Sequence, residues 1–186
     1  TVTKVDTGPL ALFHSRAWHD LIADIMGVDA TGDVNISLHH HAPGSASGEV
    51  HNDLNPGWFV DNGGVDDISV ADPALCGYWF GENARGPAYE RIRAVAVLLY
   101  LANPEWRPGD GGETGLYAAA TDPVDRPAAA IPPRNNSLLA FECTPASYHS
   151  FLTNRRVRRM SLIMWLHRPK DHVIRRWGED SIVYWG

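Results

Sequence analysis

The chain has 186 residues, of which 44% are hydrophobic, which is enough for one buried core and too little to argue for two. We therefore expect a single domain over residues 1–186. The formal net charge of −6 disfavours nucleic-acid binding and attraction to anionic membranes, so the expected partners are small molecules or neutral surfaces.

The cysteines, Cys76 and Cys143, lie far apart without CxxC spacing, which excludes a disulfide framework and a cysteine zinc site. A reducing, cytoplasmic location fits this usage. The sequence begins at Thr1 and has no signal-like segment and no apolar run of 18 residues, so we expect a trimmed soluble protein. Nothing in it indicates the oligomeric state.

The first predicted element is an amphipathic helix over residues 10–26. Its apolar residues recur at helical spacing: Phe13, Trp18, Leu21, Ile22 and Ile25. Gly27 follows as a C-terminal cap.

Most of the remaining chain predicts short strands separated by Gly, Pro and Asn clusters, at 34–41, 92–101, 137–142, 147–152 and 157–167. A helix followed by many strands indicates an α+β fold or a β-sandwich with helices packed outside. The stretch from 91 to 101 is apolar on both faces and suits a central, covered strand. Between Asp53 and Arg91 we expect a long irregular segment, which in a compact domain is usually functional or mobile.

The last predicted strand, 157–167, has two distinct faces. Period two places Met160, Leu162, Met164 and Leu166 on one face, and Arg159, Ser161, Ile163 and Trp165 on the other. Arg159 therefore begins a face that is otherwise expected to be buried. A guanidinium beside a hydroxyl forms a suitable fork for a carboxylate.

The stretch "HNDLNP" raises the question of a metal site. In an extended segment, His51 and Asp53 at i and i+2 point to one face, and "SYHSF" supplies His149 as a third ligand. Two histidines and one carboxylate leave open positions on an octahedral metal, as in non-heme Fe(II) oxygenases. The alternative is an ordinary polar loop, because HxD is a short pattern. The neighbouring run of His39, His40 and His41 cannot converge from a strand.

Together these motifs resemble the Fe(II)/2-oxoglutarate-dependent dioxygenases, and within them the prolyl 4-hydroxylase-like branch. The resemblance is carried by His51-x-Asp53, by "LLYLANPEWRPGDGGETGLY" at 98–117, and by His149 followed by Arg159-x-Ser161. It covers roughly residues 34–167. Two departures are the length of the segment after Asp53 and His41 at a position where the family often has tyrosine.

The resemblance implies a mainly β fold with flanking helices, a double-stranded β-helix or cupin-like jelly roll. By analogy, His51, Asp53 and His149 are the catalytic metal ligands that hold Fe(II). The 2-oxoglutarate cosubstrate would reach Arg159 and Ser161, with His41 a candidate for the same pocket, and O2 would take the last metal position. The family hydroxylates C–H bonds with release of succinate and CO2. The retained Asp53 favours hydroxylation over halogenation.

For the substrate, we expect a small molecule, an amino-acid derivative or a carrier-tethered compound. Residues 54–90 are proposed as a substrate-covering insert, with Trp58, Phe59 and Trp79 as candidate contacts. The alternative for these rings is packing on the core. Three other functions stay open: a peptidyl, prolyl-type hydroxylase, an enzyme of the same chemistry that desaturates, epoxidises or cyclises, and a non-catalytic cupin-like metal-binding or sensor protein.

Overall fold

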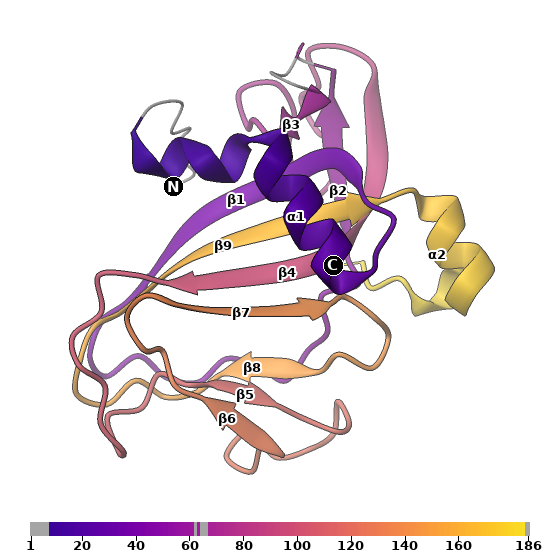
Figure 1. Cartoon of the computed structure of the whole chain (residues 1–186). Helices are drawn as coiled ribbons and strands as arrows, with labels where there is room; N and C mark the ends of the chain where they lie inside the picture. Colours follow the sequence, from indigo (N-terminus) through magenta and orange to yellow (C-terminus); the bar gives the residue numbers. More distant parts are fainter. Residues whose placement is uncertain (1–7, 62, 64–66, 185–186) are drawn as a thin grey trace.

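The computed structural model describes residues 8–61, 63 and 67–184, which form two sheets with two flanking α-helices (Figure 1). The main-sheet strands are β1 (Thr31–His41), β2 (Pro56–Val60), β3 (Ser69–Val70), β4 (Ala88–Tyr100), β7 (Ser137–Glu142) and β9 (Arg159–Arg168). The small sheet consists of β5 (Thr114–Leu116), β6 (Ala129–Ile131) and β8 (His149–Phe151). The helices are η1 (Pro9–His14), α1 (Arg16–Met26), α2 (Lys170–Trp177) and η3 (Glu179–Ser181). The prediction of a mainly β fold with helices outside is confirmed.

Strand β4 is central, as its two-sided apolar pattern predicts. The strand order is β2-β4-β9-β1-β3, and β7 also pairs with β4. The register between β4 and β9 shifts between Arg93 and Val95, which marks a β-bulge. Because a bulge changes which face the following residues occupy, Arg93 lies on the same face of the sheet as Ala96 and not with Val95.

Strand β9 separates two cores along the alternation predicted for it. Leu162, Met164 and Leu166 join the core under α1. Ile163 and Trp165 join the core on the other face, where α2 packs. The face that begins with Arg159 is therefore the face opposite α1.

The N-terminal helix covers the outer face of the main sheet, lying across β1 and β9 in Figure 1. The predicted single helix over 10–26 is wrong in one respect, because the backbone turns extended at Ser15 and separates η1 from α1. The Ser15 side chain accepts a hydrogen bond from the Trp18 amide and so caps α1. Gly27 ends α1 with φ of 62°, as predicted. Among the described residues, no helix has the length and apolar character to cross a membrane.

The segment after Asp53 is more regular than predicted. Residues 56–60 form β2, antiparallel to β4, and residues 69–70 pair with β1 as β3. The run of apolar residues "GWFV" explains β2, since alternate residues pack on a covered face. Positions 62 and 64–66 of the expected insert lie outside the described residues.

The small sheet has the order β6-β5-β8. An isolated bridge pairs His51 with His149, through hydrogen bonds of 3.0 Å and 2.8 Å between their backbones. The HxD segment is thereby attached to β8, while the same segment runs on into β2 of the main sheet. Residues 51–53 therefore connect the two sheets.

Candidate metal and cosubstrate site

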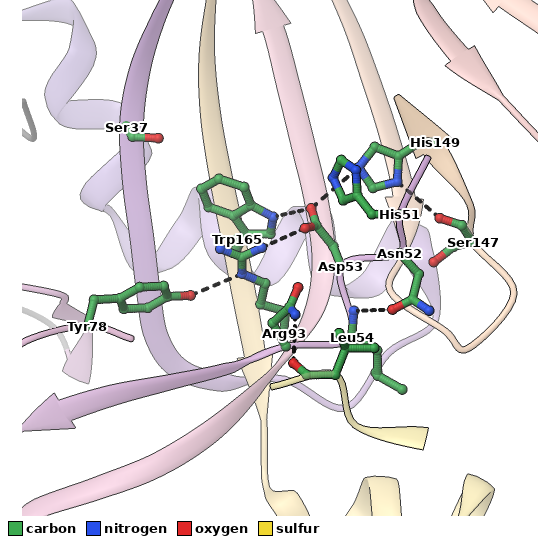
Figure 2. A network of polar contacts seen from close by, with 12 residues as sticks. Ser37, His51, Asn52, Asp53, Leu54, Tyr78, Arg93, Ser147, His149 and Trp165 are labelled. Atoms are coloured by element: carbon green, nitrogen blue, oxygen red, sulfur yellow. Dashed lines mark hydrogen bonds and ion pairs between the residues drawn. The ribbon is translucent and has the colours of Figure 1, made fainter. Parts of the chain in front are cut away.

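The three sequence-predicted metal ligands come together in the structure. One ligand atom each from His51, Asp53 and His149 lies within 4.8 Å of the others, and Figure 2 shows the two imidazoles facing the carboxylate. Among the described residues, this is the cluster of three His, Cys, Asp or Glu side chains close enough to hold a metal ion. Asp53 and His149 are buried, and His51 is half-buried.

The hydrogen bonds of both imidazoles present the same nitrogen to this cluster. His51 Nδ1 lies 2.8 Å from the Glu49 carbonyl oxygen, and His149 Nδ1 lies 3.0 Å from that of Ser147. Because a carbonyl oxygen only accepts, Nδ1 carries the proton of each ring in its neutral form, and Nε2 is then the unprotonated nitrogen. Burial also lowers the pKa of His149, which keeps this ring neutral. Both rings are thus in the tautomer that a metal ligand requires.

Both oxygens of Asp53 are held by residues that the sequence analysis did not identify. Arg93 Nη1 donates to Oδ1 at 2.6 Å, and Trp165 Nε1 donates to Oδ2 at 2.7 Å. Burial opposes ionisation of Asp53, but the Arg93 guanidinium, His149, the Trp165 hydrogen bond and His51 together outweigh it and hold the pKa of this carboxyl below its usual value. Asp53 is therefore a fixed, ionised carboxylate, as a ligand of a divalent cation has to be.

Arg93 reaches Asp53 because of the bulge in β4. Without the register shift after Arg93, alternation would place its side chain with Val95 and Val97, in the core under α1. Instead the guanidinium lies over the Trp165 ring at 4.0 Å and is 2% exposed as a residue. Bulges of this kind commonly redirect a side chain next to a functional site.

Arg159 lies at the opposite end of a small cavity and is a buried cation. It is 3% exposed, and it donates at 3.3 Å to the hydroxyls of Ser161 and Thr114. In the part of the chain that the structure describes, its Nε has no hydrogen-bond partner and no carboxylate lies within 4.0 Å of it. Burial accordingly lowers its pKa. A buried guanidinium with an unused donor is suited to an anionic ligand.

A cavity of about 160 Å³ joins Arg159 to the metal-ligand cluster. His41 lies at this cavity with its ring stacked on Phe151, the centroids 3.9 Å apart. Burial, and then the nearby Arg159, lowers the pKa of His41 to about 4, so that its ring is neutral. His39 lines the same cavity, whereas His40 is exposed on the other face, as alternation predicts.

A second, larger cavity of about 510 Å³ opens on the other side of the cluster. The two cavities share His39, His51, Asp53 and Trp165. The wall of the larger one is completed by residues of the segment 71–82, a stretch we call the covering segment. A ligand in this cavity would lie next to the metal-ligand cluster.

The three aromatic residues predicted to contact substrate have different positions. Trp79 lines the larger cavity and is 42% exposed. Phe59 is 2% exposed and packs edge-on against His167, a position that favours the packing alternative for this ring. Trp58 packs under Gly81, where any Cβ would come within 2.8 Å of the indole, so it supports the covering segment.

Comparison with known families supports the resemblance seen in the sequence. A model of the 2OG-Fe(II) oxygenase superfamily matches residues 86–167, a range that contains Arg93, His149 and Arg159. The predicted resemblance to the Fe(II)/2-oxoglutarate dioxygenases is confirmed, and the iron, 2-oxoglutarate and O2 expected as cofactors are those of the matched superfamily.

Two curated relatives point to the prolyl hydroxylase-like branch. Prolyl 3,4-dihydroxylase OGFOD1 of Ostreococcus tauri is 32% identical over 98 residues, 49% of this chain and 19% of that protein. Prolyl 3-hydroxylase OGFOD1 of Xenopus laevis is 37% identical over 78 residues, 40% of this chain and 15% of that protein. The match thus spans less than a fifth of either relative.

A solved structure agrees with the predicted architecture. A prolyl 4-hydroxylase of Phytophthora capsici superposes with a TM-score of 0.51 and 23% identity, covering 84% of this chain and 41% of that one. This likeness concerns the fold, and with the two facing sheets it confirms the double-stranded β-helix.

Proposed function

We propose that this chain, whose residues 86–167 match the 2OG-Fe(II) oxygenase superfamily, is an Fe(II)- and 2-oxoglutarate-dependent hydroxylase of a prolyl-type residue in a peptide or protein. The names of the two curated relatives support this substrate class over the small molecule expected from the sequence. The enzyme function is supported by one observation: a buried guanidinium with no carboxylate partner among the described residues lies with a His-Asp-His cluster on a cavity of about 160 Å³.

The donor set fits the proposed metal. Two neutral imidazoles and one carboxylate on one side of a site are the ligands of non-heme Fe(II) oxygenases, and they leave positions for a chelating cosubstrate and for O2. When bound, iron and 2-oxoglutarate supply the oxidising power for C–H hydroxylation, with succinate and CO2 as coproducts. His51, Asp53 and His149 would be the ligands, because these three side chains meet there.

The protein's own residues would perform the positioning. Arg159 would bind the distal carboxylate of 2-oxoglutarate with its spare Nε donor, and Ser161 and Thr114 hold the guanidinium in place. The stacked, neutral His41 closes the side of this pocket and keeps water from it. With these contacts, Arg159 would hold the cosubstrate at the end of the cavity away from His51, Asp53 and His149.

The larger cavity is the proposed substrate site. We retain the proposal that residues 54–90, which include the covering segment, are a substrate-covering insert within a single domain. Trp79 is the substrate contact that we retain from the sequence analysis, since it lines the cavity and is partly exposed. A small or carrier-tethered molecule is the second candidate. It is favoured by the cavity volume of about 510 Å³, which lies in the range of small-ligand sites.

The test is anaerobic addition of Fe(II) and 2-oxoglutarate to the purified protein, with Asp53→Ala and Arg159→Ala beside it. We expect a visible metal-to-ligand charge-transfer band in the parent and a weaker band in both variants. Proline-containing peptides and free amino acids are then compared for 2-oxoglutarate-dependent succinate formation and for a mass increase of one oxygen atom. Bound metal without the band would leave a non-catalytic metal-binding protein, and turnover with free amino acids alone would exclude the peptide substrate.

A further inference from the structure

Tyr78 belongs to the covering segment, yet its hydroxyl lies deep beside the metal-ligand cluster. The oxygen is 2.8 Å from His167 Nε2 and 3.1 Å from Arg93 Nε (Figure 2 shows the contact with Arg93). The same network contains Asp53, which is a proposed iron ligand, and Trp165, which donates a hydrogen bond to it. A side chain from the cavity wall is therefore part of the support of the metal site.

The direction of each proton in this network is determined by its ends. His167 Nδ1 lies 3.0 Å from the Asp33 carbonyl oxygen, so Nδ1 is the donor and Nε2 the acceptor of a neutral ring. Burial lowers the pKa of His167 to about 3, in agreement with a neutral ring. Tyr78 therefore donates its hydroxyl proton to His167, and its oxygen is left to accept from Arg93.

Arg93 connects Tyr78 to Asp53. Its Nε is engaged by Tyr78 and its Nη1 by Asp53 Oδ1, so the two hydrogen bonds fix the rotation of one rigid, planar group. The rings of Trp165 and Trp79 lie 4.0 Å and 4.9 Å from the guanidinium carbon. Trp79 is the neighbour of Tyr78, so the same segment supplies both the hydrogen bond and one of the rings.

The ring of Tyr78 reaches this position only when the covering segment lies against β2. The Trp58 amide donates to the Tyr78 carbonyl at 2.8 Å. At Gly57, a Cβ would come within 2.4 Å of the Tyr78 ring, so a side chain there would displace it. The Tyr78 hydroxyl therefore reaches Arg93 only while the covering segment packs against β2.

We propose that Tyr78 is a positioning residue, which through Arg93 makes the metal-binding conformation of Asp53 depend on closure of residues 71–82 over the larger cavity. The inference rests on the proposed function for the identity of the metal site. A substrate that keeps the covering segment packed against β2 would thereby also strengthen the hydrogen bond from Arg93 to Asp53. Tyr78 itself touches neither the metal nor the 2-oxoglutarate pocket.

The test compares Tyr78→Phe, which removes one oxygen and keeps the ring, with Tyr89→Phe. Tyr89 also packs near Phe59 and loses its hydrogen bond to Asp33 Oδ1, whereas Tyr78→Phe loses its bonds to His167 and Arg93. Among the described residues, no hydrogen bond or ring contact joins Tyr89 to Arg93. The probe is Mn(II) alone, titrated without 2-oxoglutarate. Because removal of residues that support metal ligands weakens affinity about 10- to 100-fold, we expect a loss of about 10-fold in Tyr78→Phe and less than about 2-fold in Tyr89→Phe.

Two further measurements separate positioning from packing. In an Arg93→Lys background, which lacks the Nε donor, Tyr78→Phe should cause no further loss of Mn(II) affinity. Hydrogen exchange of the Trp58 amide, which is bonded to the Tyr78 carbonyl, should quicken about 10-fold in Tyr78→Phe, in line with the loss of one buried hydrogen bond. An equal Mn(II) affinity in Tyr78→Phe and Tyr89→Phe, or an undiminished loss in the Arg93→Lys background, would overturn the proposal.

The outcome is independent of the proposed activity. If the parent binds Mn(II) but Fe(II) and 2-oxoglutarate give no charge-transfer band, the dioxygenase function fails, while the Mn(II) titrations still decide the role of Tyr78.

Discussion

Replacing Arg159 with methionine should stabilise the ligand-free protein. The Arg159 guanidinium is buried without a counterion among the described residues, and its bonds to Ser161 and Thr114 are both long, at 3.3 Å. A buried charge carries a desolvation penalty of several kcal/mol, and a long hydrogen bond from a charged group returns about 1.5 kcal/mol, the lower end of its range. Since methionine fills similar space without charge, we expect a gain of about 1–3 kcal/mol in the free energy of unfolding.

The assay is thermal unfolding without metal or 2-oxoglutarate, with Arg168→Met as the matched control. Arg168 is 1% exposed, but it donates to Glu142 at 2.9 Å and to the Ala94 carbonyl at 2.7 Å. Both partners keep a second donor, because Arg176 Nη1 lies 2.8 Å from Glu142 Oε1 and the Cys143 amide donates to the Ala94 carbonyl at 2.8 Å. The lost hydrogen bonds of the charged group should still lower the free energy of unfolding by about 1.5–3 kcal/mol. At about 2–4 °C per kcal/mol for a chain of this size, the two variants should shift the midpoint in opposite directions.

Ligand should reverse the ranking of the parent and Arg159→Met. With metal present, 2-oxoglutarate at about 1,000 times its Kd should stabilise the parent by about 4.1 kcal/mol and leave Arg159→Met unchanged. The reasoning is refuted if ligand-free Arg159→Met is less stable than the parent by 1 kcal/mol or more. The guanidinium would then be a structural member of the core and not a binding group kept at a cost in stability.

Three further outcomes are expected. Arg93→Met leaves the buried Asp53 carboxylate unpaired and should lower the free energy of unfolding by about 3–5 kcal/mol in EDTA, with partial recovery in Mn(II), as followed by urea denaturation. Because the pKa of His167 is depressed to about 3, the unfolded chain binds its proton below pH 6.5 and the folded chain does not, so stability should fall by about 1.4 kcal/mol per pH unit from pH 6.5 towards pH 3. This slope should flatten in His167→Gln, measured by denaturation at each pH. Trp79→Ala should raise KM for substrate about 10-fold, because its ring lines the larger cavity. It should retain the charge-transfer band of Fe(II) and 2-oxoglutarate, since Arg93 loses one ring contact but keeps its hydrogen bonds to Tyr78 and Asp53.

The ends of the site could be predicted from the sequence because they follow simple alternation. His51 and Asp53 share a face at i and i+2, and Arg159 stands on an otherwise apolar face of a regular strand. The third proposed ligand, His149, came from a separate predicted strand, and alternation alone did not place it beside His51 and Asp53. The predicted bounds of β7 and β9 were among those that the structure reproduced most closely.

The middle of the site was missed where alternation breaks down. Arg93 belongs to a strand predicted to be apolar on both faces, and a charged residue there was a usable signal, the same one that identified Arg159. Its side of the sheet was not predictable, because the bulge after Arg93 inverts the face and leaves no mark in the composition. The β2 strand was missed for a related reason, since five residues between glycines and asparagines are too few to show a period.

The bridge between His51 and His149 gives the proposed metal ion a mechanical consequence. The two ligands lie far apart along the chain, and Asp53 is anchored to β4 and β9 through Arg93 and Trp165. An ion that binds all three side chains would clip the small sheet to the main sheet and close a chain loop of about 100 residues, a constraint that in a covalent cross-link is worth about 4.7 kcal/mol. Metal occupancy would then determine how often the two sheets part, and hence how quickly a protease reaches the interior of the barrel.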